Sequence, residues 1–447
     1  MENIELGERT YAKRTVRSRE MCERAKKVEP AGVSYRIRDF DPYPFFVKES
    51  NGAHLVDLDG NVFTDYWCTH FAMILGHRHP TVLQSIKVQA EKGWHHGVSH
   101  ELEVKHAEAI TRHVPSADMV RYTSSGTEAM LFATRLARTF TKRNKVAKFE
   151  GGWHGSYDPF QLALKPPFDA PVSGGLTTGS QQDTVVLPYN DLDSSLRCMK
   201  NEKLACVLLE PVLVAGGMLP AEKEFLRGLR EYCDESGALL IFDEVVTGFR
   251  LGLGGAQGYF GVKPDLTVLG KIIGGGLPIG AICGRREIMS HFDHTKYSIP
   301  DYAHHGGTFS GNALTLAAGL GTINVLENSP VYEHIDRLGK QTLERLNSIF
   351  ESARFPAQAT GLGSLFAIHM TSKKPLRDAR GYLMCDHKQS EKLFTFLLDR
   401  DIFMLTPQML HGCISYAHTE DDVNHLTSTI ERYVNRFGDD EQKNPRA

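Results

Sequence analysis

Two neighbouring carboxylates, Asp243 and Glu244, end an apolar stretch of the sequence. The stretch ALLIFDE, residues 238–244, has the length and the apolar residues of a buried strand. An unpaired carboxylate is costly to bury, so a cationic group should meet this acidic pair. This cationic group is either another side chain of the protein or part of a ligand that the protein binds.

Lys271 ends a second apolar stretch, DLTVLGK at residues 265–271, and the glycine-rich segment IIGGGLPIG follows it. Glycines keep bulk away from the ammonium group, and poor solvation at a strand end lowers the pKa of a lysine. Such an amine is suited to imine formation with a carbonyl compound. The alternative is a surface lysine whose aliphatic stem lies along the protein.

The segment SSGTEA, residues 124–129, follows a predicted strand and begins a predicted helix. Its small residues allow backbone N–H groups and the hydroxyls of Ser125 and Thr127 to approach an anion, which the helix dipole also favours. A phosphate is the natural ligand. The same pattern also fits a plain helix cap, with a glutamate a few positions after the capping hydroxyl.

Trp153 lies in the loop GGWHG, where an indole face can stack on a flat ring; a packing tryptophan is the alternative. Together these features favour one ligand, pyridoxal 5′-phosphate. SSGTEA would hold its phosphate, Lys271 its aldehyde and Trp153 its ring face. Either Asp243 or Glu244 could hold the proton on its ring nitrogen, which makes the cofactor an electron sink. Side chains alternate along a strand, so only one faces the ring, and we predict Asp243.

Other nucleotide and metal sites lack support in the sequence. A P-loop needs a glycine five positions before Gly270, where Asp265 stands. No GxGxxG follows a strand with an acidic residue about 20 positions on, as dinucleotide binding requires. The paired histidines form neither HExxH nor a cysteine-containing ligand set, so we expect no metal.

Helices and strands must bring these residues together. Short apolar strands alternate with amphipathic helices from about residue 76, which predicts an α/β fold with a mostly parallel sheet covered on both faces. Because ligands on such sheets bind at the carboxyl ends of strands, the motifs should meet at one edge. We predict strands at 119–123, 145–150, 205–211, 238–244 and 265–271, and helices at 101–113, 127–141, 222–236, 312–327 and 331–351.

The two ends of the chain have another pattern. We predict an exposed helix over 5–27, hairpins around Gly52 and Gly60, two short strands, LFAIHM and GCISYA, and a final helix from Glu420. The predicted domains are a cofactor-binding large domain at 76–330 and a smaller α+β domain formed by 1–75 and 331–447. The loop at 165–180 is a candidate mobile lid.

The composition of the chain limits the kinds of molecule that it is expected to bind. The 447 residues carry a formal net charge of −3 without a long Lys/Arg run, which argues against nucleic acid and an anionic membrane surface. No signal peptide or membrane span is expected. Eight dispersed cysteines without a CxxC pair predict a reduced, cytoplasmic protein acting on small molecules.

These motifs resemble a known family, the class III (subgroup II) pyridoxal-phosphate aminotransferases of fold type I. Within it the chain is most similar to the glutamate-1-semialdehyde 2,1-aminomutases and their aminotransferase relatives. The resemblance covers nearly the whole chain and rests on long blocks, which are FTDYWCTHFAMILGHRHP, SSGTEA, FEGGWHG, LLIFDEVVTGFRLGLGGAQGYFGVKPDLTVLGKIIGGGLPIGA, GGTFSGNALTLAAG and SYAHTEDD.

The resemblance implies a role for each matching residue. Lys271 corresponds to the Schiff-base lysine and Asp243 to the pyridinium partner, while Val245 packs on the ring. Gly126 and Thr127 correspond to phosphate ligands. The further implied contacts are Trp153 on the ring face, in place of a tyrosine, and Thr308 on the phosphate of the neighbouring subunit of a homodimer.

The substrate residues depart from the aminomutase pattern. Arg38 of PAGVSYRIRDF stands in register with the arginine that pairs with the substrate carboxylate, with Tyr35 close by. His411 stands roughly where the aminomutases carry a glutamate, so a group suited to a substrate amine is replaced by an imidazole. We therefore hypothesise an aminotransferase acting on amino and keto substrates; the alternatives are the aminomutase and, further off, an amino-acid racemase or epimerase.

Overall fold

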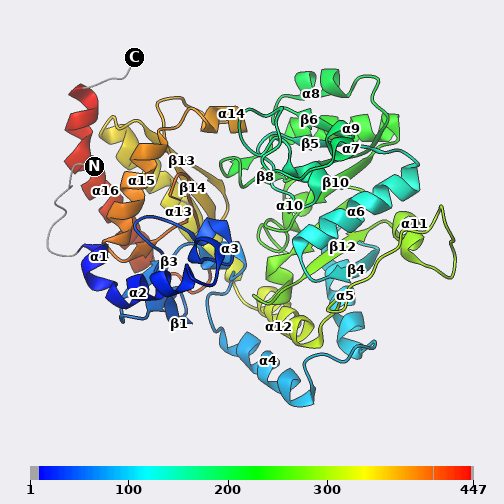
Figure 1. Cartoon of the computed structure of the whole chain (residues 1–447), viewed down its shortest axis with the longest axis horizontal. Coiled ribbons are helices and arrows are strands. Elements are labelled where there is room, and N and C mark those ends of the chain that lie inside the picture. The colour runs from blue at the N-terminus through cyan, green and yellow to red at the C-terminus, as the bar shows by residue number, and fades with distance from the viewer. Residues whose placement is uncertain (1–9, 406, 444–447) are drawn as a thin grey trace. The chain divides into compact units, whose positions relative to one another are not determined.

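The computed structural model describes residues 10–405 and 407–443 of the chain (Figure 1). Two compact units are present. The larger unit comprises Pro80–Tyr332 and Pro375–Leu383, and the smaller unit comprises the described parts of Met1–His79, Glu333–Lys374 and Met384–Ala447.

A seven-stranded sheet forms the centre of the larger unit, with the strand order β4-β12-β11-β10-β7-β5-β6. The pairs β11/β10, β10/β7, β7/β5 and β5/β6 are parallel, whereas β12 runs antiparallel to both β11 and β4. The fold class is therefore α/β with a mostly parallel sheet, as predicted. The strands are β4 (Met119–Thr123), β5 (Lys145–Phe149), β6 (Thr184–Leu187), β7 (Leu204–Leu209), β10 (Leu239–Asp243), β11 (Leu266–Gly270) and β12 (Gly280–Gly284).

The sequence did not reveal β6 and β12. Strand β12 begins in the glycine-rich segment after Lys271, whose composition indicates a loop rather than a strand. Its first residue pairs with both Thr123 and Gly270. A Cβ atom at Gly280 would lie 2.1 Å from the carbonyl oxygen of Ser125, so glycine allows the chain after β4 to approach β12. This strand thus brings two of the predicted motifs side by side.

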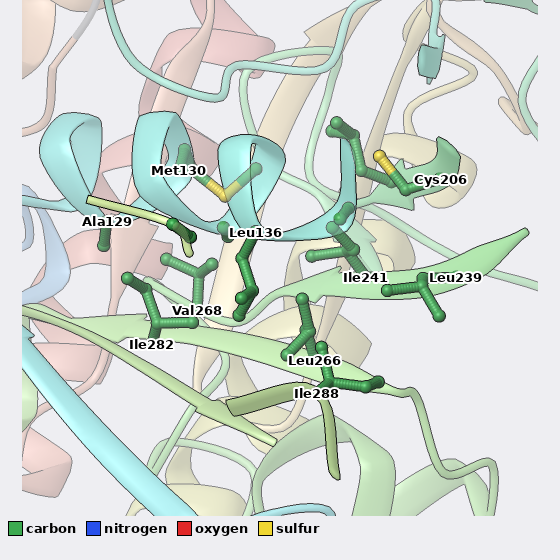
Figure 2. Close-up of a cluster of buried hydrophobic side chains, with 14 of the residues drawn as sticks. Ala129, Met130, Leu136, Cys206, Leu239, Ile241, Leu266, Val268, Ile282 and Ile288 are labelled. Atoms are coloured by element: carbon green, nitrogen blue, oxygen red, sulfur yellow. The ribbon is translucent and has the colours of Figure 1, made fainter. Parts of the chain in front are cut away.

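Helix α6 (Gly126–Thr141) packs against β7, β11 and β12 and covers the main apolar cluster of this unit. Figure 2 shows Leu136 of α6 facing the strand side chains, among them Leu266 and Val268, all fully buried. The other helices of the unit are α4 (Pro80–Lys92), α5 (Glu101–His113), α7 (Thr178–Gln182), α8 (Leu192–Met199), α9 (Lys223–Ser236), α10 (Gly255–Phe260), α11 (Arg286–Met289), α12 (Ala313–Asn328) and α14 (Ala379–Tyr382). The five predicted strands and the four predicted helices of this unit are present, and their ends differ from the prediction by at most two residues.

Helix α14 comes from a segment that the sequence assigned to the smaller domain. Its Arg380 forms two hydrogen bonds with Glu150, of 2.7 and 2.6 Å. Close packing adds to them, since a Cβ atom at Gly151 would lie 2.6 Å from that of Ala379. These contacts place residues 375–383 in the larger unit, at the loop that carries Trp153.

The smaller unit contains two sheets. One has the order β1-β2-β3-β15 and the other, wholly antiparallel, the order β13-β14-β16. Their strands are β1 (Val47–Asn51), β2 (His54–Asp57), β3 (Val62–Asp65), β15 (Ile402–Phe403), β13 (Ala357–Leu362), β14 (Leu365–Met370) and β16 (Leu410–Cys413). The helices are α1 (Tyr11–Arg14), α2 (Val16–Ala25), α3 (Cys68–Phe71), α13 (Val331–Ser352), which begins in the larger unit, α15 (His387–Leu398) and α16 (Glu420–Lys443).

Two predictions for the smaller unit need correction. The helix expected over 5–27 is broken at Thr15, whose φ of −118° and ψ of 44° are not helical, and residues 5–9 lie outside the described part. The strand expected at GCISYA ends at Cys413 and begins earlier, at Leu410, because its partner Leu365 pairs with Cys413. Among the described residues no helix is both long and apolar enough to cross a membrane.

Replacing Leu266 with alanine tests the main cluster. The side chain is fully buried, so Leu266→Ala should lower the free energy of unfolding by about 2–5 kcal/mol through lost burial and a residual cavity. Chemical denaturation measures the change. Tyr259→Ala, at a side chain that is 56% exposed, is the control and should stay within about 0.5 kcal/mol of wild type. Equal stability of the two variants would contradict the packing described.

Candidate active site

Asp243 is the last residue of β10 and is 5% exposed. Since side chains alternate along a strand, it follows Leu239 and Ile241 onto the face that α6 covers. Its Oδ2 atom lies 2.8 Å from Nδ1 of His154, and its Oδ1 atom accepts a hydrogen bond of 3.1 Å from the Val245 N–H. A buried imidazole is therefore the direct protein partner of this carboxylate.

The partner does not neutralise Asp243. Burial lowers the pKa of His154, although the Asp243 carboxylate acts in the opposite direction. The imidazole is thus neutral at neutral pH and donates its single proton from Nδ1, while its buried Nε2 atom has no hydrogen-bond partner in the described structure. The His154 contact therefore adds no positive charge beside Asp243.

Glu244 points to the other face of β10 and is engaged there. Its carboxylate accepts hydrogen bonds from the Ala256 N–H (2.5 Å), from the backbone and side-chain N–H groups of Gln257 (3.2 and 2.9 Å) and from the Thr247 hydroxyl (3.0 Å). Four donors around one buried carboxylate fix the start of α10. Of the two acidic residues, Glu244 therefore has a structural environment and Asp243 has the environment of a binding residue.

Lys271 follows β11 and has a φ of 49°, in the left-handed region that non-glycine residues seldom adopt. Such backbone strain is concentrated at functional sites. Its side chain is half-buried, and burial lowers the pKa of the ammonium, opposed by the charges of Asp243 and Glu210. A larger share of neutral amine, close to two carboxyl groups, suits a nucleophile or a base.

Val245 joins three of the predicted motifs. A Cβ atom at Gly126 would lie 3.1 Å from Cγ2 of Val245, and one at Gly270 would lie 3.2 Å from Cγ1. The glycine of SSGTEA, the glycine before Lys271 and the residue after the acidic pair therefore meet around one side chain. This is the convergence at one sheet edge that the sequence predicted.

The N-terminus of α6 forms a cradle beside Val245. The Ser125 hydroxyl accepts a hydrogen bond from the Glu128 N–H (3.2 Å), and Glu128 in turn accepts one from the Ser124 N–H (2.7 Å), so the capping arrangement is present. The N–H groups of Gly126 and Thr127 have no acceptor within the described residues. Free N–H groups at the start of a 16-residue helix can bind an anion.

Thr127 also contacts the loop that carries Trp153. Its hydroxyl accepts a hydrogen bond of 3.3 Å from the Ser156 N–H, and a Cβ atom at Gly155 would lie 2.4 Å from that hydroxyl. The side chain of Trp153 is half-buried, and the backbone N–H of Trp153 donates to Oε1 of Glu210 at 2.9 Å. Glycine at 155 thus lets this loop approach the cradle.

Three residues of this network had weak signals in the sequence. Glu210 ends one of the predicted strands and is buried, and burial followed by the charge of Asp243 raises its pKa to about 8. Lys148 is fully buried and donates to the carbonyl oxygens of Gly152 (3.0 Å), Phe160 (3.2 Å) and Leu162 (2.6 Å), which fixes the Trp153 loop. His154 follows Trp153 directly in GGWHG. Strand-interior charges such as Lys148 are themselves a signal, because they require buried partners.

The predicted substrate residues lie in the smaller unit. Arg38 and Tyr35 are exposed and line the same cavity of about 680 Å³. His411, in β16, is 5% exposed and is not among the residues that line this cavity. Burial lowers the pKa of His411 to about 3, so its imidazole is neutral.

Thr308 is exposed in a turn of the larger unit. It lines a cavity of about 710 Å³ together with Arg121 and His305, and neither Lys271 nor Asp243 contributes to that cavity. Within the described chain the structure therefore brings together Lys271, Asp243, Val245, Ser125, Gly126, Thr127 and Trp153, but not Thr308.

Comparison with known proteins agrees with these features. The family model described as "Aminotransferase class-III" matches residues 35–393. The glutamate-1-semialdehyde 2,1-aminomutase of Alkaliphilus oremlandii is 42% identical over 432 residues, which cover 94% of this chain and 99% of the relative. An omega-transaminase from Sphaerobacter thermophilus has a TM-score of 0.87 at 36% identity, covering 96% and 98% of the two chains. A transaminase with PLP bound has a TM-score of 0.86 at 33% identity, covering 95% and 99%.

The raised pKa of Glu210 predicts a pH-dependent stability. Its folded pKa of about 8 exceeds the ordinary 4.5, so the stabilisation is complete below about pH 4.5 and is lost as the pH rises to about 8. Glu210→Gln cannot titrate, so wild type should lose stability relative to this variant between pH 5 and pH 8.5. Thermal unfolding of cofactor-free protein measures the difference. Glu235→Gln, at an exposed position, is the control. A stability difference between wild type and Glu210→Gln that stays constant with pH would show that the pKa of Glu210 is not raised.

Proposed function

The chain belongs to the class-III aminotransferase family, and we propose that it moves an amino group between an amino acid and a keto acid or aldehyde. The observation that carries this proposal is the arrangement around Val245. A strained lysine, an un-neutralised buried carboxylate and the N-terminus of a long helix surround one apolar side chain. Amine, carboxylate and anion cradle are the three groups that this chemistry needs.

The cofactor is pyridoxal 5′-phosphate, and the residues present fit it. The N–H groups of Gly126 and Thr127 and the Ser125 hydroxyl suit its phosphate, and the missing Cβ atoms at Gly126 and Gly270 leave Val245 free to contact a ring. Asp243 has the charge to hold a proton on the ring nitrogen. When bound, the cofactor supplies an electron sink for the carbanion left by loss of the substrate Cα proton.

Lys271 and Asp243 have complementary tasks in this proposal. Lys271 Nζ would hold the cofactor through its aldehyde, and as a free amine it would accept the substrate Cα proton. Its lowered pKa keeps more of the amine unprotonated and able to act as that base. Asp243 would pair with the ring nitrogen, and His154 orients the carboxylate through the 2.8 Å contact. Trp153 would cover a ring face.

The remaining assignments concern substrate and assembly. Arg38 pairs with the substrate carboxylate, with Tyr35 beside it, and His411 takes a substrate-facing place as a neutral group. A homodimer would let Thr308 reach the phosphate of the neighbouring subunit; the exposed side chains of Trp94 (66%) and Phe309 (60%) support such an interface. A cytoplasmic location fits the eight dispersed cysteines of the sequence, of which Cys22, Cys206 and Cys233 are buried thiols.

The curated relatives favour a second candidate, glutamate-1-semialdehyde 2,1-aminomutase activity, because the relatives that match at about 40% identity carry that name. An aminomutase performs both half-reactions on one molecule and must bind a substrate with two sites for an amino group. His411 argues for the first candidate, since a buried neutral imidazole offers no negative charge to a second amine.

Two substitutions test the proposed roles. Lys271→Ala should abolish turnover and the visible absorbance of the cofactor-loaded protein, because no amine remains to bind the aldehyde. Asp243→Asn should retain cofactor but slow Cα-proton removal by about 100-fold or more, since the ring nitrogen loses its anionic partner. Stopped-flow absorbance and deuterium exchange at Cα measure both effects. Turnover by Lys271→Ala, or an unchanged exchange rate in Asp243→Asn, would refute the assigned roles.

Product analysis separates the candidate reactions. Loaded enzyme is incubated with α-, β- and ω-amino donors with and without a keto acceptor, and separately with glutamate-1-semialdehyde alone. An aminotransferase should form keto product only in proportion to the acceptor consumed. Conversion of glutamate-1-semialdehyde to its amino-ketone isomer without an acceptor would instead establish the aminomutase, and loss of optical purity without keto product would indicate a racemase.

A further inference from the structure

The smaller unit contains a cavity with aromatic walls, of about 680 Å³, which is large enough for a drug-sized ligand. Phe40, Phe45, Trp67 and Phe403 line it, and each keeps 7–9% of its surface accessible, whereas the nearby core residue Phe63 keeps none. The rings brace one another: Phe45 and Phe403 meet edge to face with centroids 4.9 Å apart. The four aromatic residues therefore form a nearly buried part of the cavity wall.

The backbone of the Trp67 wall is strained. Four consecutive non-glycine residues after Trp67 have left-handed conformations, with φ values of 44°, 55°, 57° and 68° for Cys68, Thr69, His70 and Phe71. An L-residue adopts this conformation at a cost, and a run of four is rare. The result is that Trp67, Thr69 and His70 all line the cavity, and the Trp67 and His70 rings lie 4.5 Å apart at an angle of 34°.

Asp65 holds this turn in place. Its Oδ1 atom accepts hydrogen bonds from the N–H groups of Trp67 and Cys68, both of 3.0 Å, and its Oδ2 atom lies 2.7 Å from Nε2 of His77. The Phe71 N–H closes the turn on the Trp67 carbonyl oxygen at 3.0 Å. Strain that several contacts maintain around a cavity fits a binding wall set before the ligand arrives.

Arg38 is a cationic side chain of this cavity that has no acidic partner in the described part of the chain. Arg38 lines the cavity, and the described part of the chain contains no ion pair or side-chain hydrogen bond of its guanidinium. The cavity has two carboxylates, and both are engaged: Asp65 as above, and Glu29 with the Ser34 hydroxyl at 2.9 Å. Glu29 keeps its charge in this hydrogen bond, so Arg38 differs from it in having no side-chain partner in the described part of the chain, and it lies on a cavity with aromatic walls.

We propose that this cavity binds a monocarboxylate with an aryl group, with the carboxylate on Arg38 and the aryl group against Trp67, His70 and Phe403. This inference rests on the proposed function, because the ligand is then the amino donor or its keto product. It names the substrate class as aryl-bearing acids rather than glutamate-like acids. A second carboxylate would meet aromatic rings instead of a cation, and its desolvation would not be offset.

Binding of unreactive acids tests the proposal independently of catalysis. Calorimetric titration of cofactor-loaded enzyme should show 3-phenylpropanoate binding about 30-fold more tightly than propanoate, from the buried ring. Glutarate should bind no better than propanoate. Trp67→Ala should remove most of the phenyl preference and Trp67→Phe should keep it, whereas Arg38→Ala should weaken both monocarboxylates by a similar factor.

Two further variants keep the result interpretable. Val33→Trp, at a half-buried residue lining the cavity, should block 3-phenylpropanoate more than propanoate even if Trp67→Ala does not fold. Val62→Ala, at an exposed position of the same unit outside the cavity, should bind both acids as wild type does. Tighter binding of glutarate, or an unchanged phenyl preference in both Trp67→Ala and Val33→Trp, would overturn the proposal. The failure of the proposed reaction can be distinguished from the failure of this proposal. If Lys271→Ala still prefers 3-phenylpropanoate to propanoate but wild type transaminates no donor, the cavity assignment stands and the proposed reaction fails.

Discussion

The burial of carboxyl groups at the carboxyl edge of the central sheet is the constraint on which the site depends. Asp243, Glu244 and Glu210 all lie on or directly after buried strands, and each must be satisfied in a poorly solvated environment. Glu244 is satisfied by four donors at the start of α10. Glu210 responds by a raised pKa, with the proton retained to about pH 8. Only Asp243 is left with a neutral partner and a charge that a cation can share.

The same constraint explains the residues that surround Asp243. His154 orients the carboxylate without cancelling its charge, and Lys148 fixes the Trp153 loop through three carbonyl oxygens. The left-handed conformation of Lys271 returns an amine to the edge of the sheet where these acids lie. In the smaller unit, residues 68–71 also have left-handed backbone conformations, and they follow Trp67 in the wall of the aromatic cavity. Both units therefore store backbone strain beside the surfaces assigned to chemistry and recognition.

Much of the fold followed from the sequence because buried parallel strands are short apolar runs with clear helical partners. Strands such as β10 and β11 were predicted to within a residue at each end. Strand β12 was not, since Gly280 is required by the close approach of Ser125 and Thr123, a tertiary contact that no local pattern encodes. Helix α14 likewise joins the larger unit through Arg380 and Glu150, which lie 230 positions apart in the chain.

The convergence of motifs was predictable from the strand-end rule, but their electrostatics were not. Alternation along the strand indicated that only one of Asp243 and Glu244 faces the ring, whereas the neutral state of His154 and the raised pKa of Glu210 depend on burial. The most direct test is a crystal structure of the protein grown with pyridoxal 5′-phosphate. We expect continuous density from Lys271 Nζ to the cofactor and an Asp243 oxygen within hydrogen-bond distance of the ring nitrogen. A cofactor bound away from Lys271, or a ring nitrogen that faces no carboxylate, would contradict the assignment.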